Sequence, residues 1–128
     1  MRYLLDTNLV IRAFYEPEML SPETATLLSD PAVDVRFSTV NIWEIAIKAA
    51  LHRPDFTADA RAVRDEALAA GFSELVVDGA HAAAVGDLPP IHADPFDRLL
   101  VAQAIVSDSV LLTSDRTVAR YPAPVRLS

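Results

Sequence analysis

The alternation of short apolar segments with helix-like segments constrains the fold of this chain most strongly. Strands that are apolar at nearly every position, instead of alternating with polar residues, are buried on both faces, which is typical of parallel sheets covered by helices. We therefore expect an α/β fold, a three-layer α/β/α sandwich with a mostly parallel central sheet of four to five strands. The expected strands are residues 2–5, 33–37, 75–77, 110–112 and 125–127.

Helices are expected between these strands, where capping residues precede apolar side chains at helical spacing. Pro22 and Pro95 each fall at a first helical position, directly after a serine or an aspartate that can cap the helix. The expected helices are residues 8–15, 22–29 and 40–51, an alanine-rich helix from a Thr57 cap to Gly71, a short helix from an Asp78 cap to Val85, a helix starting at Pro95, and one turn at 116–120.

Length and composition restrict the class of protein. The 128 residues suffice for one domain, expected to span residues 1–128. The chain has no cysteine, which excludes disulfides and thiolate metal sites and suits a reducing cytoplasm. No apolar run approaches the ~18 residues that a membrane span needs, and charged residues interrupt the N-terminal segment. We expect neither a membrane segment nor a signal peptide.

The charge balance bears on the partners of the chain. Its net charge of −7 argues by itself against nucleic-acid binding, which usually leaves a basic footprint. Carboxylates that cluster around divalent cations would reverse the sign locally. All basic residues except Lys48 are arginines, the better planar partners for phosphate.

Two aspartates follow expected strands. Asp6 comes directly after the first strand, within Asp6-Thr7-Asn8, and Asp115 follows the fourth strand after Thr113 and Ser114. In open α/β sheets, ligands bind outside the carboxyl ends of the strands, where both acids should lie. Each could instead serve only as a helix cap. Three adjacent oxygen-bearing side chains at a ligand edge favour a hard-cation site at Asp6.

Two further acids lie on expected helices. Glu44 shares a narrow polar strip with Asn41 and Lys48 on an otherwise apolar helix, so the strip either faces solvent or lines a cleft. Asp94 precedes Pro95 and should cap the next helix, which uses its oxygens. Asp97, in the first turn of that helix, is free to point into a site.

These acids indicate a type of chemistry if they converge. Carboxylates gathered at one edge repel one another unless cations bind, and oxygen ligands without cysteine or histidine select Mg²⁺ or Mn²⁺. Such a site is suited to phosphodiester hydrolysis. His52, His81 and His92 have no metal-ligand spacing and are expected to be surface or capping residues. The chain also has no serine nucleophile elbow and no glycine-rich phosphate loop.

Four segments, in order along the whole chain, resemble the PIN-domain family, most closely the VapC-type toxin ribonucleases of type II toxin–antitoxin systems. The run from His92 to Arg98 is the most specific of the four. The matching segments are Leu4 to Asn8, Trp43 to Lys48, His92 to Leu100 with Ala102-Gln103-Ala104, and Leu112-Thr113-Ser114-Asp115 through Tyr121.

The resemblance implies roles for individual residues. The catalytic acids would be Asp6, Glu44, Asp97 and Asp115. Asp6, Asp97 and Asp115 would hold the metal, and Asn8, Thr113 and the capping Asp94 would support them. Weaker candidates for contacts with RNA phosphates are Arg12, Lys48, Arg98 and Arg116, each of which could instead form an ordinary surface ion pair.

The resemblance also implies an activity and partners. It indicates a cytoplasmic Mg²⁺- or Mn²⁺-dependent endoribonuclease that acts on structured RNA, such as transfer or ribosomal RNA. It further implies a homodimer and a cognate VapB-like antitoxin, whose basic segment would enter the acidic groove. A net charge of −7 fits such a basic inhibitor better than it fits free RNA.

Two other classes of function remain open from the residues alone. A phosphatase or a phosphoacceptor receiver domain also binds Mg²⁺ on a parallel sheet. A receiver, however, needs a lysine after its last strand, and the only lysine is Lys48. The chain could also be a non-catalytic module that keeps the fold and only binds a partner.

Overall fold

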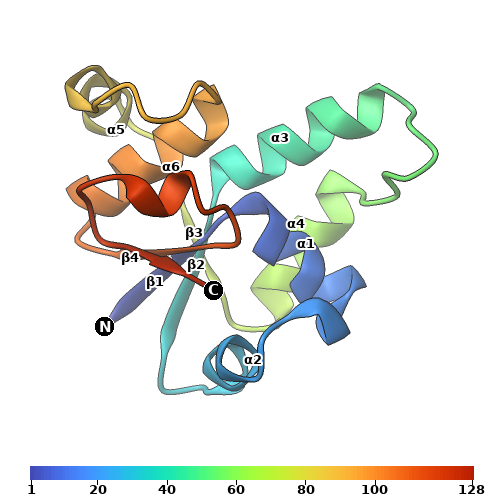
Figure 1. Cartoon of the computed structure of the whole chain (residues 1–128). Coiled ribbons are helices and arrows are strands. Elements are labelled where there is room, and N and C mark those ends of the chain that lie inside the picture. Colours follow the sequence, from blue (N-terminus) through green and yellow to red (C-terminus); the bar gives the residue numbers. More distant parts are fainter.

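The computed structural model describes all residues, 1–128, and contains a central sheet of five strands. Every strand pairing is parallel, and the order across the sheet is β3-β2-β1-β4-β5 (Figure 1). The expected α/β sandwich with a parallel sheet is confirmed. The strands are β1 (Arg2–Leu5), β2 (Asp34–Ser38), β3 (Ser73–Leu75), β4 (Val110–Thr113) and β5 (Val125–Leu127).

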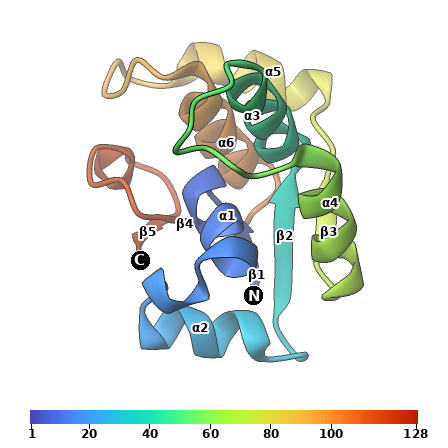
Figure 2. The ribbon, with the colours of Figure 1, turned by 90° about the vertical axis from the view of Figure 1, so that its right-hand side faces the viewer.

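Helices cover both faces of this sheet. Figure 2 shows α3 beyond the arrowhead of β2, beside α5 and α6, whereas α2 lies at the opposite end of the molecule. None of the helices is long and apolar enough to cross a membrane. The α-helices are α1 (Thr7–Tyr15), α2 (Pro22–Ser29), α3 (Thr39–Ala50), α4 (Ala60–Ala69), α5 (Gly79–Ala84) and α6 (Pro95–Val106), and the 3₁₀ turns are η1 (Pro17–Met19), η2 (Val85–Asp87) and η3 (Val118–Arg120).

The strands are apolar throughout because each face of the sheet carries its own core. Leu5 packs with Phe37 and with residues of α1, α3 and α4, whereas its neighbour Leu4 packs with Leu100 of α6 and with Leu111. Leu4 and Leu5 are both fully buried. Burial of one leucine on each face contributes roughly 1.5–3 kcal/mol per side chain, which is why successive positions of a central strand are both apolar.

The register of the two central strands places their following residues side by side. Leu5 of β1 aligns with Leu112 of β4, and the backbone N–H of Asp6 donates to the carbonyl of Leu112 at 3.0 Å. The chain continues from β1 to β2 on one side, while β4 joins β1 on the other. The strand order thus reverses beside β1, the position at which open α/β sheets bind ligands.

The expected third strand at residues 75–77 is wrong by two positions. The strand runs from Ser73 to Leu75, and the apolar Val76 beyond it is 63% exposed. β3 is an edge strand that pairs only with β2, so polar residues are tolerated in it. The Glu74 carboxylate in this strand accepts hydrogen bonds from Thr39 and Arg64, which offsets its low strand preference.

Several helix boundaries also differ from the expected ones. The alanine-rich helix is capped by Asp59, whose Oδ2 accepts from the Ala62 N–H at 3.0 Å, and Thr57 lies outside it. An aspartate is the stronger cap, and it displaces the start by two residues. That helix ends at Ala69, before the expected Gly71, and the expected turn at 116–120 is the shorter η3. The helix expected at 22–29 has its expected bounds, and those expected at 8–15 and 40–51 begin one residue earlier.

Candidate active site

One pocket at the carboxyl edge of the sheet gathers all four predicted catalytic acids. It has a volume of about 190 Å³, and no hydrophobic residue lines it. The acids come from positions after β1 and β4, from α3 and from the first turn of α6. The lining residues are Asp6, Thr7, Asn8, Glu44, Lys48, His92, Asp94, Asp97 and Asp115.

Asp6 is both a helix cap and a wall of this pocket. Its Oδ1 accepts from the Leu9 N–H at 2.8 Å, while Oδ2 accepts from the Thr113 hydroxyl at 2.7 Å and from the Ser114 N–H at 2.9 Å. Burial raises the pKa of Asp6 above its ordinary value, and these hydrogen bonds and the charge of Arg12 oppose the rise. Asp6 therefore caps the helix with one oxygen and lies in the pocket wall as well, so the cap and the site residue that the sequence offered as alternatives are compatible.

Glu44 is not on a solvated helix face. It is 4% exposed, and the Thr7 hydroxyl donates to its Oε1 at 2.6 Å. The Lys48 ammonium lies 2.6 Å from its Oε2. The amide of Asn41 donates to the Thr7 hydroxyl at 3.1 Å, so the narrow polar strip of α3 packs against the start of α1. Glu44 and Lys48 of this strip line the pocket, and Asn41 is buried behind them.

Asp94 and Asp97 divide the tasks that the sequence predicts. Asp94 Oδ1 accepts from the N–H groups of Phe96 at 2.8 Å and Asp97 at 3.1 Å, which caps α6. The side chain of Asp97 faces the pocket. Burial raises the pKa of Asp97 to about 7, and the negative charges of Asp94, Glu44 and Asp6 add to the rise. Burial and the neighbouring negative charges therefore disfavour the ionised form of Asp97.

Asp115 is held by both backbone and side-chain donors. Its Oδ1 accepts from the Thr117 N–H at 2.7 Å, and its own N–H donates to the Thr113 hydroxyl at 3.0 Å. Partial burial alone would raise the pKa of Asp115, but the hydrogen bonds from Thr117 and His92 outweigh it and leave the pKa below its ordinary value. Asp115 is thus the most readily ionised of the three proposed metal ligands.

His92 is a pocket residue that sequence reasoning missed. Its Nε2 lies 3.2 Å from Oδ2 of Asp115 and 3.5 Å from Oδ2 of Asp97. One ligand atom from each of these three residues falls within 4.8 Å of the others, so they could surround a metal ion. The spacing 92, 97 and 115 matches no metal-ligand pattern. The one feature of the sequence that could have placed His92 near the pocket is its position two residues before the Asp94 cap.

The predicted basic residues lie in different surroundings. Lys48 lines the pocket, Arg12 is half-buried on α1, and Arg116 is exposed just after Asp115. Four of the N–H donors of Arg98 point into the protein instead, to the Tyr121 hydroxyl and to the carbonyls of Val85, Leu88 and Pro89.

The other two histidines lie outside the pocket. His81 is buried, and its Nδ1 accepts from the Asp78 N–H at 3.1 Å, which completes a capping box for α5. His52 is exposed after α3. Both match the surface or capping roles expected for them.

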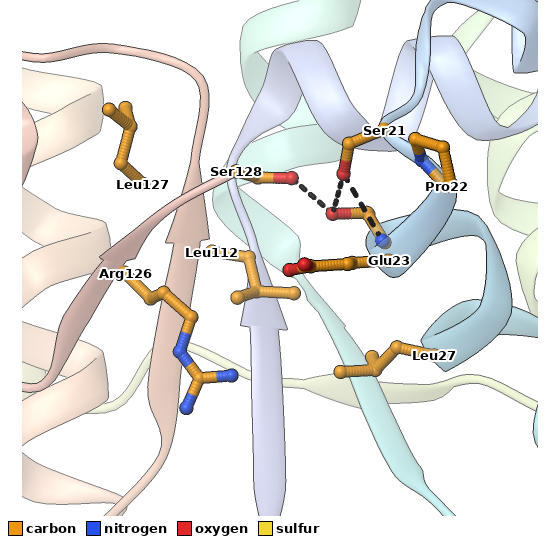
Figure 3. Close-up of a pocket in the computed structure, with 9 residues that line it drawn as sticks. Ser21, Pro22, Glu23, Leu27, Leu112, Arg126, Leu127 and Ser128 are labelled. Carbon is orange, nitrogen blue, oxygen red and sulfur yellow. Dashed lines mark hydrogen bonds between the residues drawn. The ribbon is translucent and has the colours of Figure 1, made fainter.

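A second cavity, of about 430 Å³, lies between the start of α2 and β5 (Figure 3). The hydroxyl of Thr24 lies between those of Ser21 and Ser128, so these groups satisfy one another. Arg126 stacks over the Tyr3 ring, 5.6 Å from its centroid. This cavity lacks the cluster of carboxylates and histidine that lines the acidic pocket.

The sequence profile of the PIN domain matches residues 3–124, nearly the whole chain. The chain belongs to the PIN domain family. PIN domains are in general nucleases and usually bind divalent metals, which agrees with the donor set of the acidic pocket. Curated proteins provide no match to this PIN domain.

Solved structures share its fold. The VapBC2 complex of Rickettsia felis bound to a promoter DNA fragment matches with a TM-score of 0.76 at 16% identity, over 99% of this chain and 98% of that one. DNA-bound VapBC of Salmonella typhimurium matches with a TM-score of 0.67 at 19% identity, over 100% of this chain and 97% of that one. VapBC-5 of Mycobacterium tuberculosis matches with a TM-score of 0.61 at 21% identity, over 98% of this chain and 96% of that one. At these identities the likeness shows the fold alone.

Proposed function

We propose that this PIN domain is a Mg²⁺- or Mn²⁺-dependent endoribonuclease that acts as the toxin of a VapBC-type module and cleaves structured RNA. One observation carries the proposal. Five carboxylates line one pocket without apolar residues, and burial with repulsion from neighbouring acids raises the pKa of Asp97 to about 7. A divalent cation would relieve this repulsion, so the chemistry of the donor set fits the metal that the family usually binds.

The proposed roles follow from what each side chain contacts. Asp6, Asp97 and Asp115 would hold the cation, which when bound lowers the pKa of water and neutralises charge on a phosphoryl oxygen. Glu44, oriented by Thr7 and Lys48, would complete the catalytic acids.

Supporting residues act on these acids. Thr113 donates to Asp6 and accepts from the N–H of Asp115, so one hydroxyl orients two proposed ligands. Asp94 holds the first turn of α6 that carries Asp97. Asn8 lines the pocket from the first turn of α1 and could bind a phosphate or a water molecule there.

Contacts with RNA would involve the cations around the pocket. Lys48 is the one basic residue in its wall, and Arg12 and Arg116 lie near Asp6 and Asp115. Arg98 also belongs to the proposed set, although it has only one guanidinium N–H left for phosphate. Structured RNA, such as transfer or ribosomal RNA, is the proposed substrate class.

A protein partner belongs to the same proposal. The matched structures are VapBC complexes, and α3 with its C-cap residue carries three apolar side chains at four-residue spacing that are 56%, 38% and 57% exposed: Trp43, Ile47 and Leu51. Exposed apolar stripes of this kind support a protein interface. We propose a VapB-like antitoxin as the partner, a homodimer as the toxin's own state, and the cytoplasm as the compartment where it meets RNA.

The proposal is tested by incubating the purified chain with total cellular RNA in Mn²⁺, in Mg²⁺ and in a chelator. We expect cleavage with either metal and none with the chelator. Asp97→Asn should reduce cleavage by at least about a hundredfold while its circular dichroism spectrum stays unchanged. Undiminished cleavage by Asp97→Asn, or cleavage in the chelator, would refute the metal-site assignment.

A further inference from the structure

The imidazole of His92 is held in one orientation. Its Nδ1 accepts a hydrogen bond from the backbone N–H of Asp94 at 3.0 Å. The backbone of His92 is held as well, because the Tyr121 hydroxyl accepts from the His92 N–H at 3.0 Å and donates to the His92 carbonyl at 3.3 Å. Neither the ring nor its backbone can rotate without breaking these bonds.

The Tyr121 hydroxyl is itself fixed. Tyr121 is 3% exposed, and Arg98 Nη1 donates to its oxygen at 3.1 Å. A hydroxyl has one proton to donate and two lone pairs, and here all three are used. Arg98 follows Asp97 directly on α6, and its other donors bind the carbonyls before His92. The network therefore connects three parts of the chain: the helix that carries Asp97, the segment that carries His92, and the segment after Asp115 that carries Tyr121.

These hydrogen bonds determine which ring nitrogen carries the proton. Because Nδ1 accepts from the Asp94 N–H, the proton lies on Nε2. This N–H faces Oδ2 of Asp115 at 3.2 Å and Oδ2 of Asp97 at 3.5 Å. A protonated Nε2 has no lone pair to offer a metal ion, although its position beside two carboxylates resembles that of a ligand.

We propose that His92 is a positioning residue of the acidic pocket. Its Nε2–H donates to Asp115 and lies within reach of Asp97, so it keeps the two carboxylates at one separation and leaves the cation to oxygen ligands. Tyr121 and Arg98 position His92 in turn. Groups that orient metal ligands commonly alter metal affinity without touching the ion. The inference rests on the proposed function in assuming that the pocket takes a divalent cation.

The tautomer of His92 provides the first test. Nitrogen NMR of the ¹⁵N-histidine-labelled full chain should show an Nε2-protonated ring, assigned by its absence in His92→Gln. This tautomer should persist when Mg²⁺, a diamagnetic probe, is added to saturation. A ring that averages between tautomers, or that moves its proton to Nδ1 on Mg²⁺ addition, would overturn the proposal.

Metal affinity provides the second test, by calorimetric titration with Mn²⁺. His92→Ala and Tyr121→Phe should each weaken Mn²⁺ binding about tenfold. His92→Gln should stay within about threefold of the parent, because its amide N–H can replace the imidazole donor. A metal-ligand role predicts a different pattern, in which His92→Gln loses as much Mn²⁺ affinity as His92→Ala.

The outcomes separate this inference from the proposed function. Thermal unfolding of each variant verifies that it folds, and Tyr121→Phe keeps the ring that packs in the core. Unchanged Mn²⁺ affinity in all three variants would overturn the inference alone. Absence of Mn²⁺ binding to the parent chain would overturn both. Binding that follows the expected pattern without RNA cleavage would refute only the proposed function.

Discussion

The ammonium group of Lys48 lies 2.6 Å from Oε2 of Glu44, in the wall of the acidic pocket. Thr7 occupies the other oxygen of this carboxylate. The chain therefore pairs one of the four proposed catalytic acids with a cation of its own, and the other three of these four are the residues proposed to hold the metal. This division gives Lys48 effects of opposite sign on metal binding and on RNA binding.

Lys48→Met should strengthen Mn²⁺ binding and weaken RNA binding. One unit charge a few ångströms from the ion contributes ~1 kcal/mol even in a water-like dielectric, so Mn²⁺ affinity should rise about fivefold. The KM for RNA should rise because the one basic group in the pocket wall is lost. Calorimetry and steady-state cleavage measure the two effects, and Lys48→Arg is the control that keeps the charge. If the affinities for Mn²⁺ and for RNA both rose or both fell in Lys48→Met, the proposed role of Lys48 would be contradicted.

Asp97→Asn should stabilise the metal-free protein at neutral and alkaline pH. The folded-state pKa of Asp97, about 7, is above the ordinary value of 3.8, so the ionised group destabilises the fold. The penalty is absent below pH ~4, grows as the pH rises towards 7 and is constant above it. We expect a gain of about 2–4 kcal/mol at pH 8 in a chelator.

Denaturant titrations of the parent and Asp97→Asn between pH 4 and 8 measure this difference. Asp65→Asn, which removes an exposed acid on α4, is the matched control and should show no such pH dependence. Equal stability of Asp97→Asn and the parent at every pH would show that burial and neighbouring charges do not raise the pKa of Asp97.

Mn²⁺ should stabilise the parent and remove most of its pH dependence. A cation at a hundredfold excess over its Kd adds about 2.7 kcal/mol to the free energy of unfolding, because it binds only the folded chain. Thermal unfolding with and without Mn²⁺ measures the shift in Tm. Asp97→Asn should show a much smaller shift. A chelator should leave the parent folded, since two apolar cores stabilise the fold without metal.

Asp94 should tolerate asparagine but not alanine. Its Oδ1 accepts two backbone N–H groups at the start of α6, a task that asparagine performs nearly as well. Asp94→Asn should keep most of the RNA cleavage, and Asp94→Ala should lose about 1 kcal/mol of stability. Urea unfolding and cleavage rates measure both. Loss of activity in a fully stable Asp94→Asn would show that Asp94 acts on the cation or the RNA directly.

Local sequence patterns predicted much of the fold. Leu4 and Leu5 mark a strand buried on both faces, and Asp94 with Pro95 marks the start of α6. Both signals can be recognised locally, because an unbroken apolar run and a capping residue before a proline involve only neighbours in the chain. The third strand was misplaced because its position at Ser73–Leu75 depends on pairing with the distant strand β2, and the apolar Val76 beyond it is exposed.

The sequence by itself determined the α/β class, the caps and the acids at the strand ends, because periodicity and residue chemistry are local properties. Only the tertiary structure decided that Glu44 is buried between Thr7 and Lys48, that Arg98 holds Tyr121, and that His92 meets Asp115. Asp6 and Thr113 are 107 positions apart, yet their side chains are hydrogen-bonded at 2.7 Å. Contacts between such distant positions depend on strand order and register, which no local pattern encodes.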